Sequence, residues 1–408
     1  MTHLQQFDKK NFRIFVVVLS ILLLACLFCS NSIPTTSPAT NTERSPRLAL
    51  WLAKKAELLS REEAAYDLVM TGWLTADEAN SITSRSPQTK LLAGLTHTWI
   101  LEDPDWLDLL ITVANNGNPG GSLQITESMR LKLDQNGDGL LDENCSPPGW
   151  DRISAMDPRD PAWREVVLAF YQNTAAQPQH DGVIVDMVDA YPFCDGGWSE
   201  DVPSPISQAE WVAAQDELLG LIRALVPDDK WVIANAGADF PAGSPFPQHL
   251  NGYVLENFLG SWGAGLEEGL ASAQRALVTT HEPHLVVFAV DTENTGIIDW
   301  RKIRIGLAAS LLLDNTFFAF DSGPADHGGV TDWWLPVYDF SLGQALGPFE
   351  EQNGCYRRTF EYGLVLLTSD TDQTLQLGYE AVNIFNGESG TLFDIPLNDA
   401  VILIQTGE

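Results

Sequence analysis

The chain of 408 residues has few basic side chains: 23 Lys and Arg stand against 55 Asp and Glu, for a formal charge of −32. Nucleic acids and anionic membrane surfaces bind clustered Lys and Arg, so this deficit argues against both as partners. Five Cys and seven His are present, and no Cys pair stands at the spacing of a zinc site. The acidic charge is typical of a well-solvated extracellular surface.

The motifs of several enzyme classes are also missing. No Gly-rich phosphate loop follows the first apolar segment, which leads into Ala53-Lys54-Lys55, and this argues against a nucleotide-binding open sheet. There is no obvious serine triad, and no His-rich segment offers ligands for a metal-dependent hydrolase, which is therefore the weakest functional hypothesis. The 13 Trp and the low charged content indicate a folded chain.

The N-terminus predicts export. Basic residues precede an apolar run over 14–28, which is typical of a secretory signal, and Leu23-Leu24-Ala25-Cys26 resembles a bacterial lipobox. We predict a signal or lipoprotein segment over 1–29 and a flexible linker over 30–46, which is rich in Ser, Thr, Pro and Asn. The expected product is an exported bacterial cell-surface lipoprotein lipidated at Cys26. An uncleaved anchor and free secretion are the alternatives, and membrane contact is expected only through this anchor.

Short apolar segments recur along the rest of the chain and alternate with helical or loop segments. One predicted helix starts around Pro161 after the N-cap Asp160, and another covers about 207–225. The alternation predicts an α/β fold, and the count of eight predicts a (β/α)8 TIM barrel over 47–350. A small C-terminal antiparallel β domain is expected over 351–408, and the protein is expected to be a monomer. The predicted strands are 48–52, 67–70, 91–95, 183–185, 231–235, 252–256, 285–291 and 317–321.

Polar or acidic residues follow the later strands. The run Val183-Ile184-Val185 is entered by Asp181-Gly182 and leads to Asp186 and Asp189, whereas Asp181 has a structural role at the turn. Barrel enzymes carry their catalytic groups at the C-terminal ends of strands. Hydrolysis of a glycosidic bond needs two carboxyls that face each other across it. The other strand ends are Asn235, Glu256 with Asn257, Asp291 with Glu293, and Asp321.

Each candidate also has a structural interpretation. Asp186 is the first catalytic candidate, although it could instead brace a loop, and Glu256 could form a rim salt bridge. Asp189 either contacts substrate or caps a loop. Asn235 either binds a sugar hydroxyl or satisfies backbone groups at the strand end, which is the commoner role of a single Asn. Substrate or support roles are expected for Asp291, Glu293 and Asp321.

Tryptophans in the predicted rim loops suit the apolar faces of sugar rings, or else they anchor long loops. Trp198 and Trp262 are the substrate-binding candidates among them. The scattered histidines, such as His97, are expected to be solvated or packed and not to serve as ligands. The rim tryptophans are Trp150, Trp198, Trp262, Trp300, Trp333 and Trp334.

The segment 134–145 matches a shortened calcium loop of the EF-hand type. Its oxygen donors are Asp134, Asn136, Asp138 and Asp142, while Cys145 takes the place of the closing Glu, which excludes a standard EF-hand. Glu143 could close the loop instead, and the alternative is a plain polar turn. A structural calcium ion is thus the one expected cofactor, with none for catalysis. A disulfide between Cys145 and Cys194 is as plausible as two unrelated thiols.

Several motifs together resemble a known family. The segment 181–186 is similar to the "DGVFLD" strand of bacterial glycosidase TIM barrels, which include hypothetical glycosyl hydrolase family 15 and, more distantly, the endo-α-1,4-polygalactosaminidases. The segment 253–258 resembles their sixth-strand "E-x-F" element, and 338–348 with 356–365 resembles their junction of barrel and β domain. Val185 stands where Leu is usual, and Met187 where Asn is common.

The resemblance covers most of 47–408 and implies a barrel with Asp186 and Glu256 as the catalytic pair. It leaves the substrate and the activity itself open. The sequence therefore predicts a glycoside hydrolase that acts on an extracellular oligo- or polysaccharide. The alternative is a non-catalytic, carbohydrate-binding surface lipoprotein.

Overall fold

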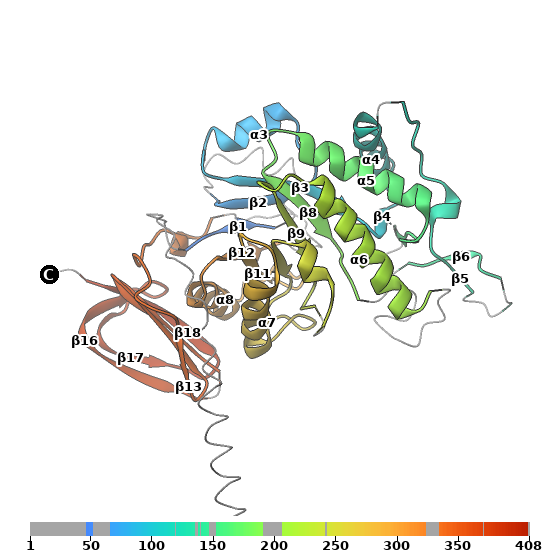
Figure 1. Cartoon of the computed structure of the whole chain (residues 1–408). Coiled ribbons are helices and arrows are strands. Elements are labelled where there is room, and N and C mark those ends of the chain that lie inside the picture. The colour runs from blue at the N-terminus through green and yellow to red at the C-terminus, as the bar shows by residue number, and fades with distance from the viewer. Residues whose placement is uncertain are drawn as a thin grey trace, which may run out of the picture. The chain divides into compact units, whose positions relative to one another are not determined.

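The computed structural model describes most of the chain after residue 45 (Figure 1). The predicted signal segment, Cys26, Asn136, Cys194 and Trp198 lie outside the described residues. No helix within the described ranges is long and apolar enough to cross a membrane. These ranges are 46–51, 66–118, 120–134, 138, 140–146, 152–190, 206–240, 243–323, 334–369 and 371–406.

Eight parallel strands form one sheet whose spatial order follows the chain. Leu48 pairs with Phe318, and Phe318 N donates to Arg47 O at 3.0 Å, so the last strand meets the first and closes the sheet. All eight predicted strands are confirmed, and the fold is a (β/α)8 barrel. The strands are β1 (Ala49–Leu50), β2 (Leu68–Thr71), β3 (Lys90–Thr96), β8 (Gly182–Asp186), β9 (Trp231–Asn235), β10 (Gly252–Leu255), β11 (Leu285–Asp291) and β12 (Thr316–Asp321).

Helices lie outside the barrel strands (Figure 1). Asp160 accepts hydrogen bonds from the first turn of α5, with Pro161 at its first position, so the predicted N-cap is confirmed. Ser207 and Glu210 form a capping box at the start of α6. The connection from β9 to β10 holds the 3₁₀ helix η2 (Phe246–His249). The α-helices are α3 (Ala76–Thr83), α4 (Pro104–Gly117), α5 (Pro161–Ala176), α6 (Gln208–Leu225), α7 (Leu266–Thr279) and α8 (Trp300–Leu312).

The long segment between β3 and α5 adds two small antiparallel ribbons near the rim. One pairs β4 (Trp99–Leu101) with β7 (Ile153–Ala155), and the other pairs β5 (Lys132–Leu133) with β6 (Glu143–Asn144). The 3₁₀ helix η1 (Glu127–Met129) precedes β5. Trp99, Leu131, Leu133 and Cys145 pack with Trp211 of α6 in a separate apolar cluster. The insertion therefore has its own small core against the barrel.

The C-terminal strands form a six-stranded antiparallel sheet in the order β13-β14-β15-β18-β16-β17. It follows the 3₁₀ helix η3 (Pro336–Tyr338). The predicted antiparallel sheet is confirmed, while the exact domain boundary at 350 and 351 stays a prediction. Arg304 of α8 donates to Asp399 at 2.8 and 2.6 Å, which joins barrel and sheet. The strands are β13 (Glu350–Gln352), β14 (Cys355–Phe360), β15 (Gly363–Thr368), β16 (Gln373–Asn383), β17 (Ser389–Ile395) and β18 (Asp399–Gln405).

Side chains alternate between the barrel interior and the helix layer, as the period of two along a strand requires. Along β8, Val183 and Val185 belong to the large outer core, and Ile184 belongs to the inner cluster. Gly94 of β3 lies against β8 so closely that a Cβ atom there would stand 1.7 Å from Ile184 O. The inner cluster contains Ala49, Trp51, Leu68, Met70, Leu92, Ile184, Ile233, Val254, Leu285, Val287, Ala289, Phe317 and Ala319.

Candidate active site

Five of the predicted site residues continue the inward-facing row of their strands. Each stands two positions after a residue of the inner cluster, and two positions restore the same face of a strand. Because the strands are parallel, these polar groups meet at the C-terminal rim of the barrel. The sequence-predicted rim is therefore one site. Its members are Asp186 after Ile184, Asn235 after Ile233, Glu256 after Val254, Asp291 after Ala289, and Asp321 after Ala319.

Asn235 joins the two carboxylates of the predicted pair. Its Nδ2 donates to Asp186 Oδ1 at 3.0 Å and to Glu256 Oε2 at 2.7 Å, and its Oδ1 accepts from Gly237 N at 2.9 Å. One amide nitrogen thus touches both carboxylates, and the turn after β9 fixes that amide. The arrangement brings Asp186 and Glu256 to the same point of the rim, from strands on either side of β9.

The backbone after Asp186 adopts an unusual conformation. Met187 has a φ of 54°, a region that disfavours side chains other than Gly, Asn and Asp. Its N–H donates to Asp186 Oδ1 at 2.9 Å, and its carbonyl accepts from Thr98 Oγ1 at 3.3 Å. The next amide, of Val188, donates to Asn235 O at 3.0 Å. The surroundings hold this strained turn, and the turn sets the direction of the Asp186 carboxylate.

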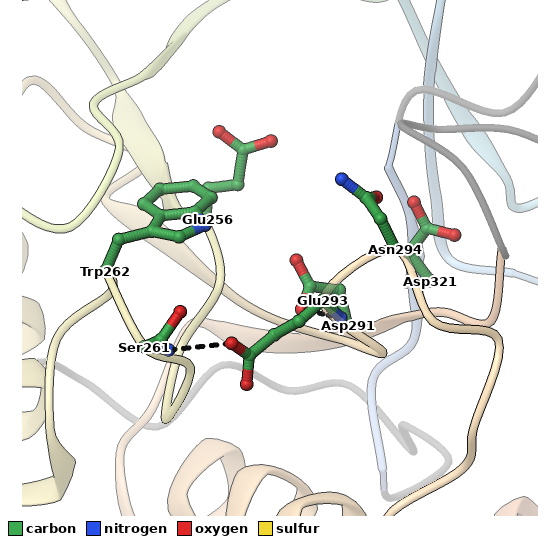
Figure 2. A pocket seen from close by; sticks show the side chains of 7 residues that line it. All are labelled: Glu256, Ser261, Trp262, Asp291, Glu293, Asn294 and Asp321. Carbon is green, nitrogen blue, oxygen red and sulfur yellow. Dashed lines mark hydrogen bonds between the residues drawn. The ribbon is translucent and has the colours of Figure 1, made fainter. Parts of the chain in front are cut away.

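Glu256 lines an open cavity of about 180 Å³. Figure 2 shows Glu256 and Trp262 on one side of it and Asn294 and Asp321 on the other, with Asp291 and Glu293 between them. Trp51, at the end of the inner row of β1, donates its indole N–H to Glu256 Oε1 at 3.3 Å. The glutamate is therefore held from two sides while it borders the cavity.

Trp262 presents its ring to this cavity through the loop after β10. The loop contains two non-Gly residues with positive φ, Asn257 at 48° and Leu259 at 68°. The buried Asn257 amide, oriented with its nitrogen towards Asp291, donates to Asp291 Oδ1 at 3.1 Å, and its oxygen accepts from Trp262 Nε1 at 2.5 Å. Since the indole N–H is engaged by Asn257 and the side chain is 52% exposed, Trp262 offers its ring face to a ligand.

The two acidic groups between the sides of the cavity, Asp291 and Glu293, differ in their electrostatic state. Burial raises the pKa of Asp291, and the neighbouring Glu256 and Asp321 add to the effect. Glu293 instead accepts from Lys302, which lowers its pKa to about 2, and Ser261 N donates to it at 3.3 Å. Glu293 is thus a fixed anion that ties the loops after β10 and β11 together.

Asp189 is buried and does not line the cavity. Its side chain is 6% exposed. Its carbonyl accepts from Trp211 Nε1 at 3.0 Å and from Gln215 Nε2 at 2.6 Å, both on α6. Burial raises its pKa well above the ordinary value, and the charges of Asp186 and Glu256 act in the same direction. So little exposed surface leaves scarcely any area for a substrate contact.

His97 is packed, as expected. It is fully buried beside the Asp186 carbonyl and the Gln215 side chain, and this burial lowers its pKa to about 3. The imidazole is therefore neutral over the physiological range. Among the described residues, no group of three or more His, Cys, Asp or Glu side chains is placed to hold a metal ion.

The remaining sequence predictions have mixed outcomes. Trp334 packs edge-on against Tyr66 and Tyr338, so it anchors its loop. Asp138 Oδ1 accepts from Leu140 N at 2.9 Å, and with Asn136 outside the described residues the calcium loop stays a prediction. Cys145 is disulfide-bonded. Its pairing with Cys194 stays a prediction, because Cys194 lies outside the described residues. Cys355 is a free thiol.

Four residues contribute to the site in ways that were not predicted from the sequence: Trp51, Lys302 and Gln215, and also Asn257, which was predicted only as a polar residue at a strand end. The alternation of side chains along β1 could have predicted Trp51, because Ala49 and Trp51 are two positions apart and both face the barrel interior. The other three act through contacts between segments that are distant in the chain or through a loop conformation. Periodicity carries no information on such contacts.

The chain matches the family model described as hypothetical glycosyl hydrolase family 15 over residues 130–364. The sequence matches no curated protein. Among solved structures, an isomalto-dextranase from Arthrobacter globiformis is 11% identical with a TM-score of 0.45, covering 84% of this chain and 66% of that one, slightly less than two thirds. The glycoside hydrolase domain of PelA from Pseudomonas aeruginosa is 13% identical with a TM-score of 0.40, covering 69% and 96%.

An α-galactosidase from Geobacillus stearothermophilus is 9% identical with a TM-score of 0.45, covering 90% of this chain and 56% of that one. The family match carries the assignment, because it spans more than half of the 408 residues and includes both Asp186 and Glu256. The protein belongs to hypothetical glycosyl hydrolase family 15.

Proposed function

We propose that the protein hydrolyses an extracellular oligo- or polysaccharide with retention of anomeric configuration, through Asp186 and Glu256. The observation that carries this proposal is the Asn235 amide nitrogen, which lies within hydrogen-bonding distance of both carboxylates. Because both hydrogen bonds share the Asn235 Nδ2 atom, Asp186 Oδ1 and Glu256 Oε2 cannot be further apart than the summed lengths of the two bonds. So close an approach favours the carboxyl separation of roughly 5–5.5 Å typical of retaining enzymes over the wider separation of inverting ones.

The geometry also favours a division of roles. Asp186 is held at the barrel wall by Met187 N and Asn235, so we assign it as the nucleophile that attacks the anomeric carbon. Glu256 borders the open cavity beside Trp262, so we assign it as the acid that protonates the departing glycosidic oxygen. Water then attacks the glycosyl ester on Asp186, and Glu256 accepts the proton of that water. This step frees the sugar and restores both carboxyls.

The cavity supplies contacts that suit a sugar. The exposed ring face of Trp262 can stack on an apolar sugar face, and Asp291 and Asp321 can accept hydrogen bonds from hydroxyls. Glu293 is already bound to Lys302 and Ser261 N, so we expect it to shape the cavity and not to react. No catalytic cofactor takes part in this scheme.

The test compares the wild type with Asp186→Asn and Glu256→Gln on a panel of polysaccharides, with release of reducing ends as the readout. We expect the wild type to cleave at least one polymer and each variant to lose roughly 10²–10⁴-fold in rate, the range that positioned acid–base groups supply. Glu388→Gln, an equivalent change at an exposed position in the turn between β16 and β17, is the matched control and should keep wild-type activity. Turnover by Asp186→Asn at the wild-type rate would reject the pair.

The same variants separate catalysis from binding alone. A non-catalytic surface lectin would migrate more slowly in gels that contain its glycan, in wild type and variants alike, and would release no reducing ends.

We also propose that Cys26 carries a lipid, on the sequence pattern around it. Replacement of this cysteine with Ser should then shift the protein from the membrane fraction to the medium.

A further inference from the structure

We propose that Asp189 is a positioning residue: a buried, neutral carboxylic acid that donates its O–H to the Asp186–Glu256 pair. This inference rests on the proposed function of that pair. Under it, Asp189 does not touch the substrate but acts through the two groups that do. The carboxyl would support an ionised Asp186 without placing a third negative charge beside it.

The backbone fixes where this carboxyl can be. The Asp189 carbonyl accepts from Trp211 Nε1 at 3.0 Å and Gln215 Nε2 at 2.6 Å. One residue earlier, Val188 N donates to Asn235 O at 3.0 Å, and Asn235 is the residue that joins the pair. The segment that follows β8 is thus tied to α6 on one side and to β9 on the other, with little freedom to turn the carboxyl outward.

The surroundings of the carboxyl favour a proton on it. Its Oδ2 is buried and has no hydrogen-bond partner among the described residues, and a buried carboxylate without a partner or a cation is costly. Within the described ranges, the charged groups that act on it are Asp186 from β8 and Glu256 after β10, and both are carboxylates.

The other side chains that face it carry no positive charge. The neutral Trp99 indole of β4 acts in the opposite direction and lowers the pKa of Asp189, but by less than burial raises it, and Trp211 and Gln215 contact its carbonyl from α6. The neighbouring His97 is kept neutral by its full burial. A protonated Asp189 avoids a third anion in the field of Asp186 and Glu256 and turns a buried, unpartnered acceptor into a donor.

The protonation state can be measured without any substrate. We expect the infrared difference spectrum of wild type minus Asp189→Asn at pH 7 to contain the carbonyl stretch of a protonated carboxylic acid, shifted in D₂O. Carboxylate bands in that difference spectrum would overturn the proposal. Because this readout needs no turnover, it decides the state of Asp189 even if the proposed hydrolase activity is refuted.

The positioning role is tested by two variants of similar side-chain size. Asp189→Asn keeps a donor and should retain kcat within about threefold, while Asp189→Leu removes the donor and should lower kcat about tenfold or more at little change in KM. We also expect Asp189→Leu to move the acidic limb of the pH profile upward, because Asp186 loses support for its ionised form. A loss in Asp189→Asn as large as in Asp186→Asn, or equal kinetics of the Asn and Leu variants, would overturn the role. Urea unfolding of both variants reports folding, and if Asp189→Leu does not fold, the infrared result and Asp189→Asn decide.

Discussion

Acid is expected to destabilise this fold through His97, whose imidazole is fully buried with a pKa of about 3 against 6.5 in an unfolded chain. As the pH falls below 6.5, the unfolded chain takes up a proton that the folded protein does not accept until about pH 3. Unfolding then gains about 1.36 kcal/mol for each pH unit. The stability that neutral His97 contributes is present above pH 6.5 and is lost progressively on acidification.

Between pH 7 and pH 4.5 this single group should remove about 2.5 kcal/mol of stability, a sizeable share of the ~5–15 kcal/mol of a typical fold. The assay is urea unfolding followed by tryptophan fluorescence at both pH values, for wild type and His97→Gln. The His97→Gln variant is expected to differ from the wild type in overall stability. The quantity compared is therefore the decrease in the free energy of unfolding between pH 7 and pH 4.5 in each protein. We expect that loss to be smaller in His97→Gln by about 2.5 kcal/mol. An equal loss in both proteins would refute the assignment of a neutral, buried imidazole.

Three further predictions concern single contacts. Asn235→Leu removes the hydrogen bonds to both carboxylates and should lower kcat about 10²-fold or more on the polymer found in the panel; wild-type kcat would contradict the bridging role. Asn257→Ala and Trp262→Ala should each raise KM several-fold, and the double variant should raise it by less than the product of the two single effects, because Asn257 holds the Trp262 indole as well as Asp291; fully independent effects would contradict this coupling. Arg358→Met should lower the free energy of unfolding by about 2 kcal/mol, since Arg358 is 5% exposed and donates to Leu311 O, Gly347 O and Asp314; an unchanged urea midpoint would show that this link between β14 and α8 is not stabilising.

The barrel was predictable because local patterns determine it. Eight apolar runs, separated by helical segments, left few alternatives to a closed parallel sheet. The polar residues that follow those runs also kept their alternation, which is why Asp186, Asn235 and Glu256 face the same rim. An N-cap such as Asp160 is equally local, because its partners stand two and three residues further along the chain.

The finer structure of the site depends on contacts that no local pattern encodes. The sequence predicts that Asn235 binds a sugar hydroxyl or satisfies backbone groups; its Oδ1 does accept from Gly237 N, and the register of β8, β9 and β10 also puts its Nδ2 between two carboxylates. Asp189 follows a rim strand, which suggested a substrate contact, but Trp211 and Gln215 of α6 draw its backbone inward. In both cases, contacts between segments that are distant in the chain add a feature that neither of the predicted roles describes.

The central claim is that Asp186 forms a covalent bond to the sugar while Glu256 serves as acid and base. Intact-mass and peptide mass spectrometry of Glu256→Gln test it most directly, after incubation with 2,4-dinitrophenyl glycosides of the sugars found in the cleaved polymer. Such a leaving group departs without protonation, whereas attack by water still needs the missing base, so the intermediate should accumulate. The account predicts one added sugar unit on the peptide that contains Asp186. An adduct on another residue, or turnover of the glycoside without any adduct and with inverted configuration, would contradict it.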